Sequence, residues 1–122
     1  MTAFINGEKE RARLALEAAR AVIPFDPNSA ANRTYYAAFH AFTAFFASRG
    51  QTFTRHVTLR NAVHRDLVQA GLLPVSIGQD FDFLMDMREA GDYGGLVQVS
   101  PSDARAAIET AARTLDLVLS MC

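Results

Sequence analysis

One stretch of the sequence carries the residue types that could handle phosphate chemistry. Between Asn32 and Phe46, the turn of about 100° per residue in an α-helix places Arg33, Tyr36 and His40 on one side. Arg33 and His40 are separated by about two turns, or roughly 10 Å along the axis, so their side chains can lean together into a small polar cluster. An arginine can hold a phosphate and a histidine can move a proton. Cleavage of RNA needs both roles.

Two interpretations of this helix face stay open. In the first, the three polar side chains form a binding or catalytic site. In the second, they form a buried, hydrogen-bonded network at a subunit interface and do no chemistry. Ala37, Ala44 and Ala47 lie on the same side of the helix and would let another chain approach closely. These alanines indicate a dimer interface on this face.

A second group of charged residues lies near a predicted helix end. Arg88 and Asp92 are four residues apart, so they can form an ion pair that fixes the next loop, with Tyr93 as an anchor. Alternatively, Arg88 and Tyr93 face the same groove as His40. We include Arg88, Asp92 and Tyr93 among the candidate ligand-binding residues.

The segment 55–65 is rich in basic side chains. They are Arg55, His56, Arg60, His64 and Arg65. One interpretation is a face that contacts phosphate groups, and the other is a solvated helix surface. The two histidines of the segment do not share a helix face, and no cluster of carboxylates lies near them in the sequence. We therefore predict no metal site here.

Composition limits the classes of function. The chain has 122 residues, which suit a single domain over 1–122 with one core. A net charge of −1 gives no global electrostatic reason for binding nucleic acid or an anionic membrane. Cys122 is the single cysteine, so neither a disulfide framework nor a thiolate metal site can form. No signal peptide and no long apolar run is evident, which favours a cytoplasmic protein with no membrane partner.

The sequence also lacks the motifs of common enzymes. It has no glycine-rich phosphate loop, no GxSxG segment and no alternation of strands and helices. Kinase, serine hydrolase and dinucleotide-binding interpretations therefore have no support, and we predict no cofactor.

Helical periodicity predicts the elements that position these residues. We expect helices over 6–23 after an Asn6 cap, 27–49 after Asp26, 55–70 after a Thr54 cap, 75–90, and from Ser100 to residue 120. Asp26 and Ser100 are each followed by proline, a combination typical of a helix start. Glycines at 91, 94 and 95 predict a loop, and Leu96, Val97 and Val99 predict an extended connector. Together these elements predict an all-α helical bundle.

Four segments together resemble the HEPN domain family. They are Arg33-x-Tyr35-Tyr36-Ala37-x-Phe39-His40-Ala41, Arg55-His56, Ala70-Gly71-Leu72-Leu73-Pro74 and Arg88-x-x-x-Asp92-Tyr93-Gly94. The resemblance covers about residues 20–120 and is closest to the short, stand-alone prokaryotic branch. It implies a five-helix domain on an up-and-down four-helix bundle, usually a homodimer. It also implies a toxin–antitoxin-like pair with a minimal nucleotidyltransferase encoded beside it.

Many members of this family are metal-independent ribonucleases. Their site is an Arg followed, after four to six residues, by a His late in the domain and doubled across the dimer. Here Arg88 takes the late position, but Asp92 and Tyr93 follow it and no His does. Arg33 and His40 have that spacing, with six residues between them, but they lie in the second predicted helix.

We therefore expect, first, a dimeric module that binds a nucleotide, RNA phosphate or a partner and is not primarily an enzyme. Its ligand-binding residues would be Arg33, Tyr36, His40, Arg88, Asp92 and Tyr93. The alternative is a metal-independent ribonuclease toxin in which His40 is the general acid or base and Arg33 stabilises the developing charge. A third hypothesis is a purely structural interaction module, whose polar stripe only sets the dimer register.

Overall fold

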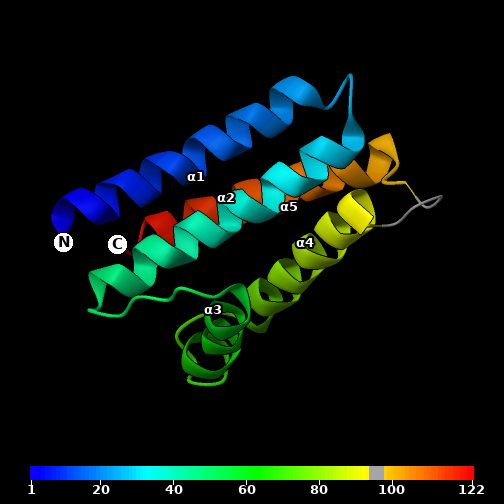
Figure 1. The fold of residues 1–122 in the computed structure, drawn as a ribbon. Helices are drawn as coiled ribbons and strands as arrows, with labels where there is room; N and C mark the ends of the chain where they lie inside the picture. Colours follow the sequence, from blue (N-terminus) through cyan, green and yellow to red (C-terminus); the bar gives the residue numbers. More distant parts are fainter. Residues whose placement is uncertain (94–97) are drawn as a thin grey trace.

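Five α-helices make up most of the chain (Figure 1). The computed structural model describes residues 1–93 and 98–122, Tyr93 by its backbone alone. The elements are α1 (Thr2–Val22), α2 (Pro27–Ser48), α3 (His56–Ala62), the π-helix η1 (Val63–Val68), α4 (Val75–Tyr93) and α5 (Pro101–Leu119). No strand occurs within the two described ranges. The all-α prediction is confirmed.

Helix α2 lies at the centre of the bundle and packs against α1, α3, α4 and α5. In Figure 1, α1 and α2 run side by side in opposite directions, α5 lies behind α2, and α4 crosses below it. The buried face of α2 carries large rings, and Tyr35, Phe42 and Phe45 have no exposed surface. The core surrounds this face of α2 and thereby fixes the rotation of the helix about its axis. The opposite face is held between α1 and the side of the bundle that α3 and α4 form.

Two predicted helix starts are confirmed. The Asp26 side chain accepts a hydrogen bond from the Ser29 backbone N–H at 3.1 Å, and Ser100 accepts one from the Asp103 backbone N–H at 3.0 Å. The Ser29 hydroxyl also donates to Asp26, and these bonds hold the pKa of the Asp26 carboxyl below its ordinary value. In both cases a side chain satisfies a backbone donor that the first turn of a helix leaves without a partner.

Two other predicted caps are wrong. Helix α1 begins at Thr2 with Met1 as its N-cap, so Asn6 lies inside the helix. Helix α3 has Arg55 rather than Thr54 as its N-cap, and no side chain bonds to its first turn. The predicted single helix over 55–70 is an α-helix followed by the wider turns of η1. An Asn or Thr before a helical pattern is compatible with an N-cap, but the packing against neighbouring helices decides at which residue the helix begins.

The predicted loop at Gly91 is also wrong, because α4 continues to Tyr93. A Cβ atom on Gly91 would lie 2.9 Å from the backbone oxygen of Asn28. Glycine therefore lets the last turn of α4 lie directly against the start of α2. The predicted connector residues at 94–97 lie outside the described residues, whereas Val99 is buried against the N-terminal end of α2.

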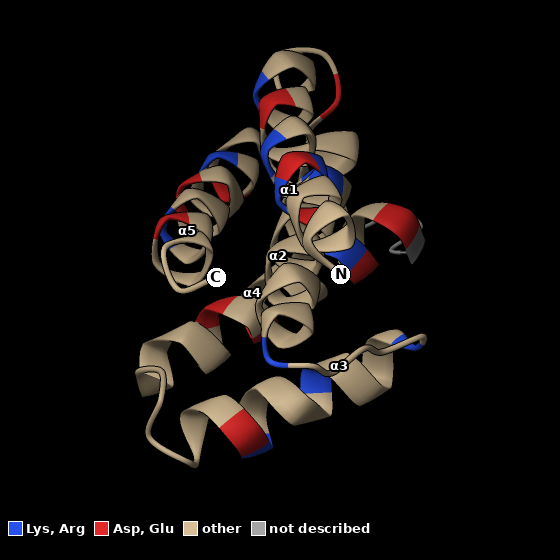
Figure 2. Ribbon diagram, turned by 90° about the vertical axis from the view of Figure 1, so that its left-hand side faces the viewer, with Lys and Arg blue, Asp and Glu red and all other residues tan. Residues whose placement is uncertain are grey.

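Charged residues of both signs are interspersed along α1 and α5 (Figure 2). This distribution agrees with the net charge of −1 and leaves local clusters as the places where charge can select a ligand. Among the described residues, no helix is both long and apolar enough to span a bilayer.

Candidate functional site

The three polar residues predicted on α2 do share one groove. Arg33, Tyr36 and His40 line a depression of about 600 Å³ between α1 and α2. The remaining lining residues are Arg11, Leu14, Ala15, Ala18 and Asn32. The small side chains of α1 keep the groove wide enough to admit a ligand, while two guanidinium groups and an imidazole supply its polar surface. We call this depression the α1–α2 groove.

The alanines predicted to form a dimer interface are not on this surface. Ala37, Ala44 and Ala47 are at most 2% exposed in the single chain. They serve the close packing of helices inside the monomer. The argument for a dimer that rested on these three alanines is therefore wrong.

The imidazole of His40 is held by a buried carboxylate. His40 Nδ1 lies 2.6 Å from Glu8 Oε2, and the Glu8 side chain is only 7% exposed. Glu8 also accepts a hydrogen bond from Arg11 at 3.1 Å. A carboxylate that accepts from Nδ1 fixes the ring orientation and leaves Nε2 as the nitrogen that can accept a proton or a hydrogen bond. The His40 side chain is 22% exposed and lines the groove, so part of the ring is open to a ligand.

Sequence reasoning missed Glu8 as a site residue, although the sequence contains a signal. Glu8 occupies the same helical stripe as Ala12 and Ala19, both of which have no exposed surface. A carboxylate in line with the buried stripe of a helix needs a buried partner. The partner, His40, can be identified only once the packing of α1 on α2 is known.

The predicted ion pair at the end of α4 is present. Asp92 Oδ2 lies 3.5 Å from Arg88 Nε, close enough for an ion pair but not aligned as a hydrogen bond. Asn32 donates a hydrogen bond to the same carboxylate oxygen at 3.0 Å. Arg33 and Asp92 both line a second depression of about 430 Å³, which adjoins the α1–α2 groove because Asn32 and Arg33 line both.

Arg88 itself lies behind the groove rather than in it. Its guanidinium packs over the rings of Tyr35 and Tyr36, at 5.3 Å and 5.5 Å from their centroids. The side chain is 19% exposed, and Nε is buried with no hydrogen-bond partner among the described residues. Arg88 therefore supports Tyr36 from behind and adds positive potential to the site. The side chain of Tyr93, also predicted here, lies outside the described residues.

A second histidine lies on the other side of Tyr36. The Tyr35 hydroxyl is 2.9 Å from His56 Nδ1, and the His56 ring stacks on Phe39 with centroids 4.3 Å apart. Burial raises the pKa of Tyr35 to about 12, although nearby Arg88 opposes the rise. Burial, together with the positive charge of Arg88 and the proximity of His40, lowers the pKa of His56. His56 therefore stays neutral near pH 7.

Three other basic side chains of the segment 55–65 are paired with carboxylates. Asp82 Oδ1 lies 3.1 Å from Arg60 Nε and 3.0 Å from His64 Nε2. Arg65 forms two hydrogen bonds with Asp66. Asp66 and Asp82 compensate part of the charge of the segment, and Asp82 attaches its helical part to α4. Of its residues, His56 alone belongs to the aromatic cluster beside the groove.

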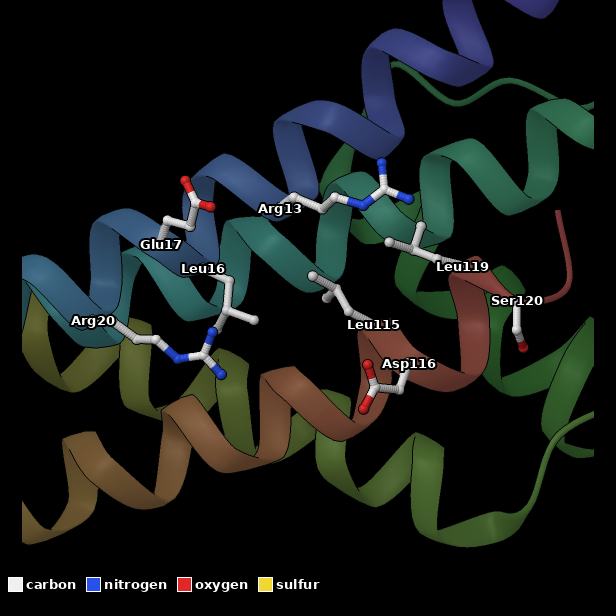
Figure 3. Close-up of a pocket in the computed structure, with 8 residues that line it drawn as sticks. All are labelled: Arg13, Leu16, Glu17, Arg20, Leu115, Asp116, Leu119 and Ser120. Carbon is white, nitrogen blue, oxygen red and sulfur yellow. The ribbon is translucent and has the colours of Figure 1, made fainter.

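A further cleft of about 450 Å³ lies on the other face of α1, against α5 (Figure 3). Its polar side chains are Arg13, Glu17, Arg20, Asp116 and Ser120. Acidic and basic groups are mixed here, and no imidazole is present. None of the predicted site residues lies in this cleft, and no group of three His, Cys, Asp or Glu side chains in the described ranges is placed to hold a metal ion.

Comparisons with known proteins agree with this arrangement of helices. The HEPN domain profile matches residues 5–121. A UPF0332 protein of Thermotoga maritima is 30% identical over 111 residues, which cover 90% of this chain and 84% of that protein. The crystal structure of TT1696 from Thermus thermophilus superposes with a TM-score of 0.78 over 97% of this chain and 98% of that one. Its 18% identity makes it evidence for the fold alone.

Proposed function

The chain belongs to the HEPN domain family, and from this premise we propose that it is a module that binds the phosphate of a nucleotide or an RNA strand. The observation that carries the proposal is the convergence of Arg33, Tyr36 and His40 in the α1–α2 groove. Its natural partners would be a second copy of the chain and a minimal nucleotidyltransferase, as in a toxin–antitoxin-like pair.

The charges of the groove favour an anion. Arg11 is paired with Glu8, but Arg33 forms no ion pair with any described residue. A guanidinium presents a fork of N–H donors that fits two phosphate oxygens at once. Tyr36 can add a hydroxyl, and the partly buried guanidinium of Arg88, which is paired with Asp92, packs behind its ring. Arg33 is therefore the principal phosphate ligand in this proposal.

A second candidate function is metal-independent RNA cleavage, and the bond between Glu8 and His40 favours it. With Nδ1 held, His40 Nε2 would take the proton of a ribose 2′-hydroxyl. The 2′-oxygen would then attack phosphorus, the bond from phosphorus to the 5′-oxygen would break, and the leaving oxygen would take a proton from water. Arg33 would stabilise the charge that develops on the phosphate oxygens.

One experiment separates these functions. The purified chain is mixed with single-stranded RNA in EDTA, and both binding and cleavage are measured for wild type, Arg33→Ala and His40→Ala. Arg20→Ala is the matched control, because it removes one positive charge from the other face of α1. We expect the wild type to bind the RNA. Arg33→Ala should weaken this binding about tenfold or more, and Arg20→Ala should leave it nearly unchanged.

The outcomes are distinct. Cleavage that disappears in folded His40→Ala would make the chain a ribonuclease. Absence of both binding and cleavage in the wild type would overturn the proposal and leave a structural interaction module. Light scattering of the same samples tests the homodimer, which a monomeric mass at micromolar concentration would contradict.

A further inference from the structure

The cleft between α1 and α5 is built differently from the α1–α2 groove, with an apolar floor between charged rims (Figure 3). Leu16 of α1 forms the floor together with Leu115 and Leu119 of α5. Leu16 and Leu115 are 7% and 4% exposed, so they close the cleft toward the core, whereas Leu119 is only partly buried. Apolar surface is therefore still open to solvent on the α5 side of the cleft.

The apolar floor continues along α5. Ile108 and Ala112 precede Leu115 and Leu119 by seven residues each, so they lie on the same headings to within about 20°. Both are only partly buried. We call Ile108, Ala112, Leu115 and Leu119 the α5 seam. Their spacing of 4, 3 and 4 residues is that of a stripe that packs against another helix, and the seam is about 17 Å long, or three turns. Other residues of α5, such as Ala111, face the core, so the seam is a second apolar stripe on this helix.

Charges of opposite sign border the two sides of the seam. On α1, Arg13 and Arg20 are seven residues apart, and on α5 so are Glu109 and Asp116. Figure 3 shows the Arg20 side chain extending from α1 into the space beside α5. Among the described residues, Arg20 and Asp116 form no ion pair, and the ion pair of Arg13 is a 3.8 Å contact with an exposed glutamate. These charges are therefore available to a partner.

We propose that the α1–α5 cleft docks one amphipathic helix of a partner protein. The apolar stripe of that helix packs on the α5 seam, its acidic edge faces Arg13 and Arg20, and its basic edge faces Glu109 and Asp116. Charge complementarity selects this class of partner, because a strand of uniform charge would be attracted by one rim and repelled by the other. Reversing a helix exchanges its edges, so the rims also select the direction in which the helix lies.

This inference goes beyond the proposed phosphate-binding function and does not depend on it. The cleft shares none of its lining residues with the α1–α2 groove. The partner helix would therefore bind on the opposite side of α1 from the phosphate ligand, and each site can be altered without changing the other.

The test uses two labelled synthetic peptides of about three heptads, each with leucine at both core positions. The mixed peptide carries glutamate on one edge and lysine on the other, and the lysine peptide carries lysine on both edges. Binding is followed by fluorescence anisotropy with the peptide at nanomolar concentration, where it does not associate with itself. We expect the wild type to bind the mixed peptide about fivefold more tightly than the lysine peptide.

Reversing the charge of one rim should reverse this preference. In Arg13→Glu/Arg20→Glu both rims are acidic, so the lysine peptide should bind about fivefold more tightly than the mixed peptide. The matched control is Arg55→Glu/Arg65→Glu, which changes the net charge equally at the start of α3 and in η1. This control should keep the wild-type preference.

A charge placed within the seam should weaken both peptides. Ala112→Glu puts a carboxylate where the leucines of the peptide would pack, and we expect a loss of about tenfold or more. Ala106→Glu is the control, because Ala106 is exposed on the same helix and lies outside the seam. Thermal unfolding first verifies that each variant is folded, and light scattering gives its mass in solution.

Reversal of the preference together with the loss in Ala112→Glu would support the proposal. It is overturned if the wild type binds neither peptide, or if either of these two changes has no effect. It is also overturned if the wild type is a dimer that Ala112→Glu dissociates, because a second copy of the chain then covers the cleft. None of these variants alters the α1–α2 groove, so RNA binding through Arg33 is judged separately.

Discussion

Glu8 and His40 are 32 residues apart in the sequence, yet the Glu8 carboxylate lies 2.6 Å from His40 Nδ1. The bond joins α1 to α2 at the end of the groove. The bond gives the buried Glu8 carboxylate a polar partner on α2, which it would otherwise lack. The same bond orients the imidazole of His40, which lines the groove. Structural and functional roles of the pair are therefore coupled, and a substitution at Glu8 should affect both.

Glu8→Gln should destabilise the fold by about 1–3 kcal/mol, because a neutral amide replaces the buried acceptor of a charge-assisted hydrogen bond. It should also weaken RNA binding or cleavage, since the His40 ring is no longer fixed. Urea unfolding followed by circular dichroism measures the first effect. Glu10→Gln is the control: its side chain is 59% exposed, and we expect a change within about 0.5 kcal/mol. Equal stability of Glu8→Gln and wild type would show that the pair contributes nothing to folding.

The sequence predicted those features of the fold that local chemistry determines. Asp26 and Ser100 bond to N–H groups three residues away, so both helix starts were readable without tertiary structure. The face of α2 that carries Arg33, Tyr36 and His40 was also readable, because a helix fixes which of its own residues share a side.

Contacts between helices were not predictable in the same way. Glu8 meets His40 only because of the rotation of α1 about its axis, and Tyr35 meets His56 only because of the path of the segment between α2 and α3. Gly91 suggested a loop by its residue type. In the structure it lies in the last turn of α4, where the lack of a side chain allows close packing against Asn28. Residue type indicates which groups need partners, but the packing decides which partners they find.

The stability of the fold should decrease in mild acid because of His56. Burial first, then Arg88 and His40, lowers its folded pKa below the ordinary value of 6.5. The unfolded chain therefore binds a proton that the folded chain resists, and stability falls as the pH drops below 6.5 toward the folded pKa. Unfolding free energies at pH 7 and pH 5 should differ less in His56→Asn than in wild type. An identical pH dependence in the two proteins would contradict this assignment.

In strong base, the relevant group is Tyr35. Burial raises its pKa to about 12 from 10.0, with Arg88 opposing the shift. The folded state keeps a phenolic proton that the unfolded state releases, so stability is full below pH 10 and is lost as the pH rises from 10 toward 12. Absorbance titration of the three tyrosines should contain a late phase near pH 12. Tyr35→Phe should remove that phase, and its persistence in the variant would assign it to another tyrosine.

Two glycines inside helices should respond to alanine with opposite signs. A Cβ on Gly91 would lie 2.9 Å from the backbone oxygen of Asn28, which cannot move without shifting α2. Gly91→Ala should therefore cost about 1–3 kcal/mol and displace Asp92 from Asn32. Gly7, within α1, has no atom within 4 Å of such a Cβ, so Gly7→Ala should stabilise the fold by up to about 1 kcal/mol through helix propensity alone. Urea unfolding of both variants measures the difference. If Gly91→Ala is as stable as Gly7→Ala, the close packing of α4 against α2 is not what selects glycine at position 91.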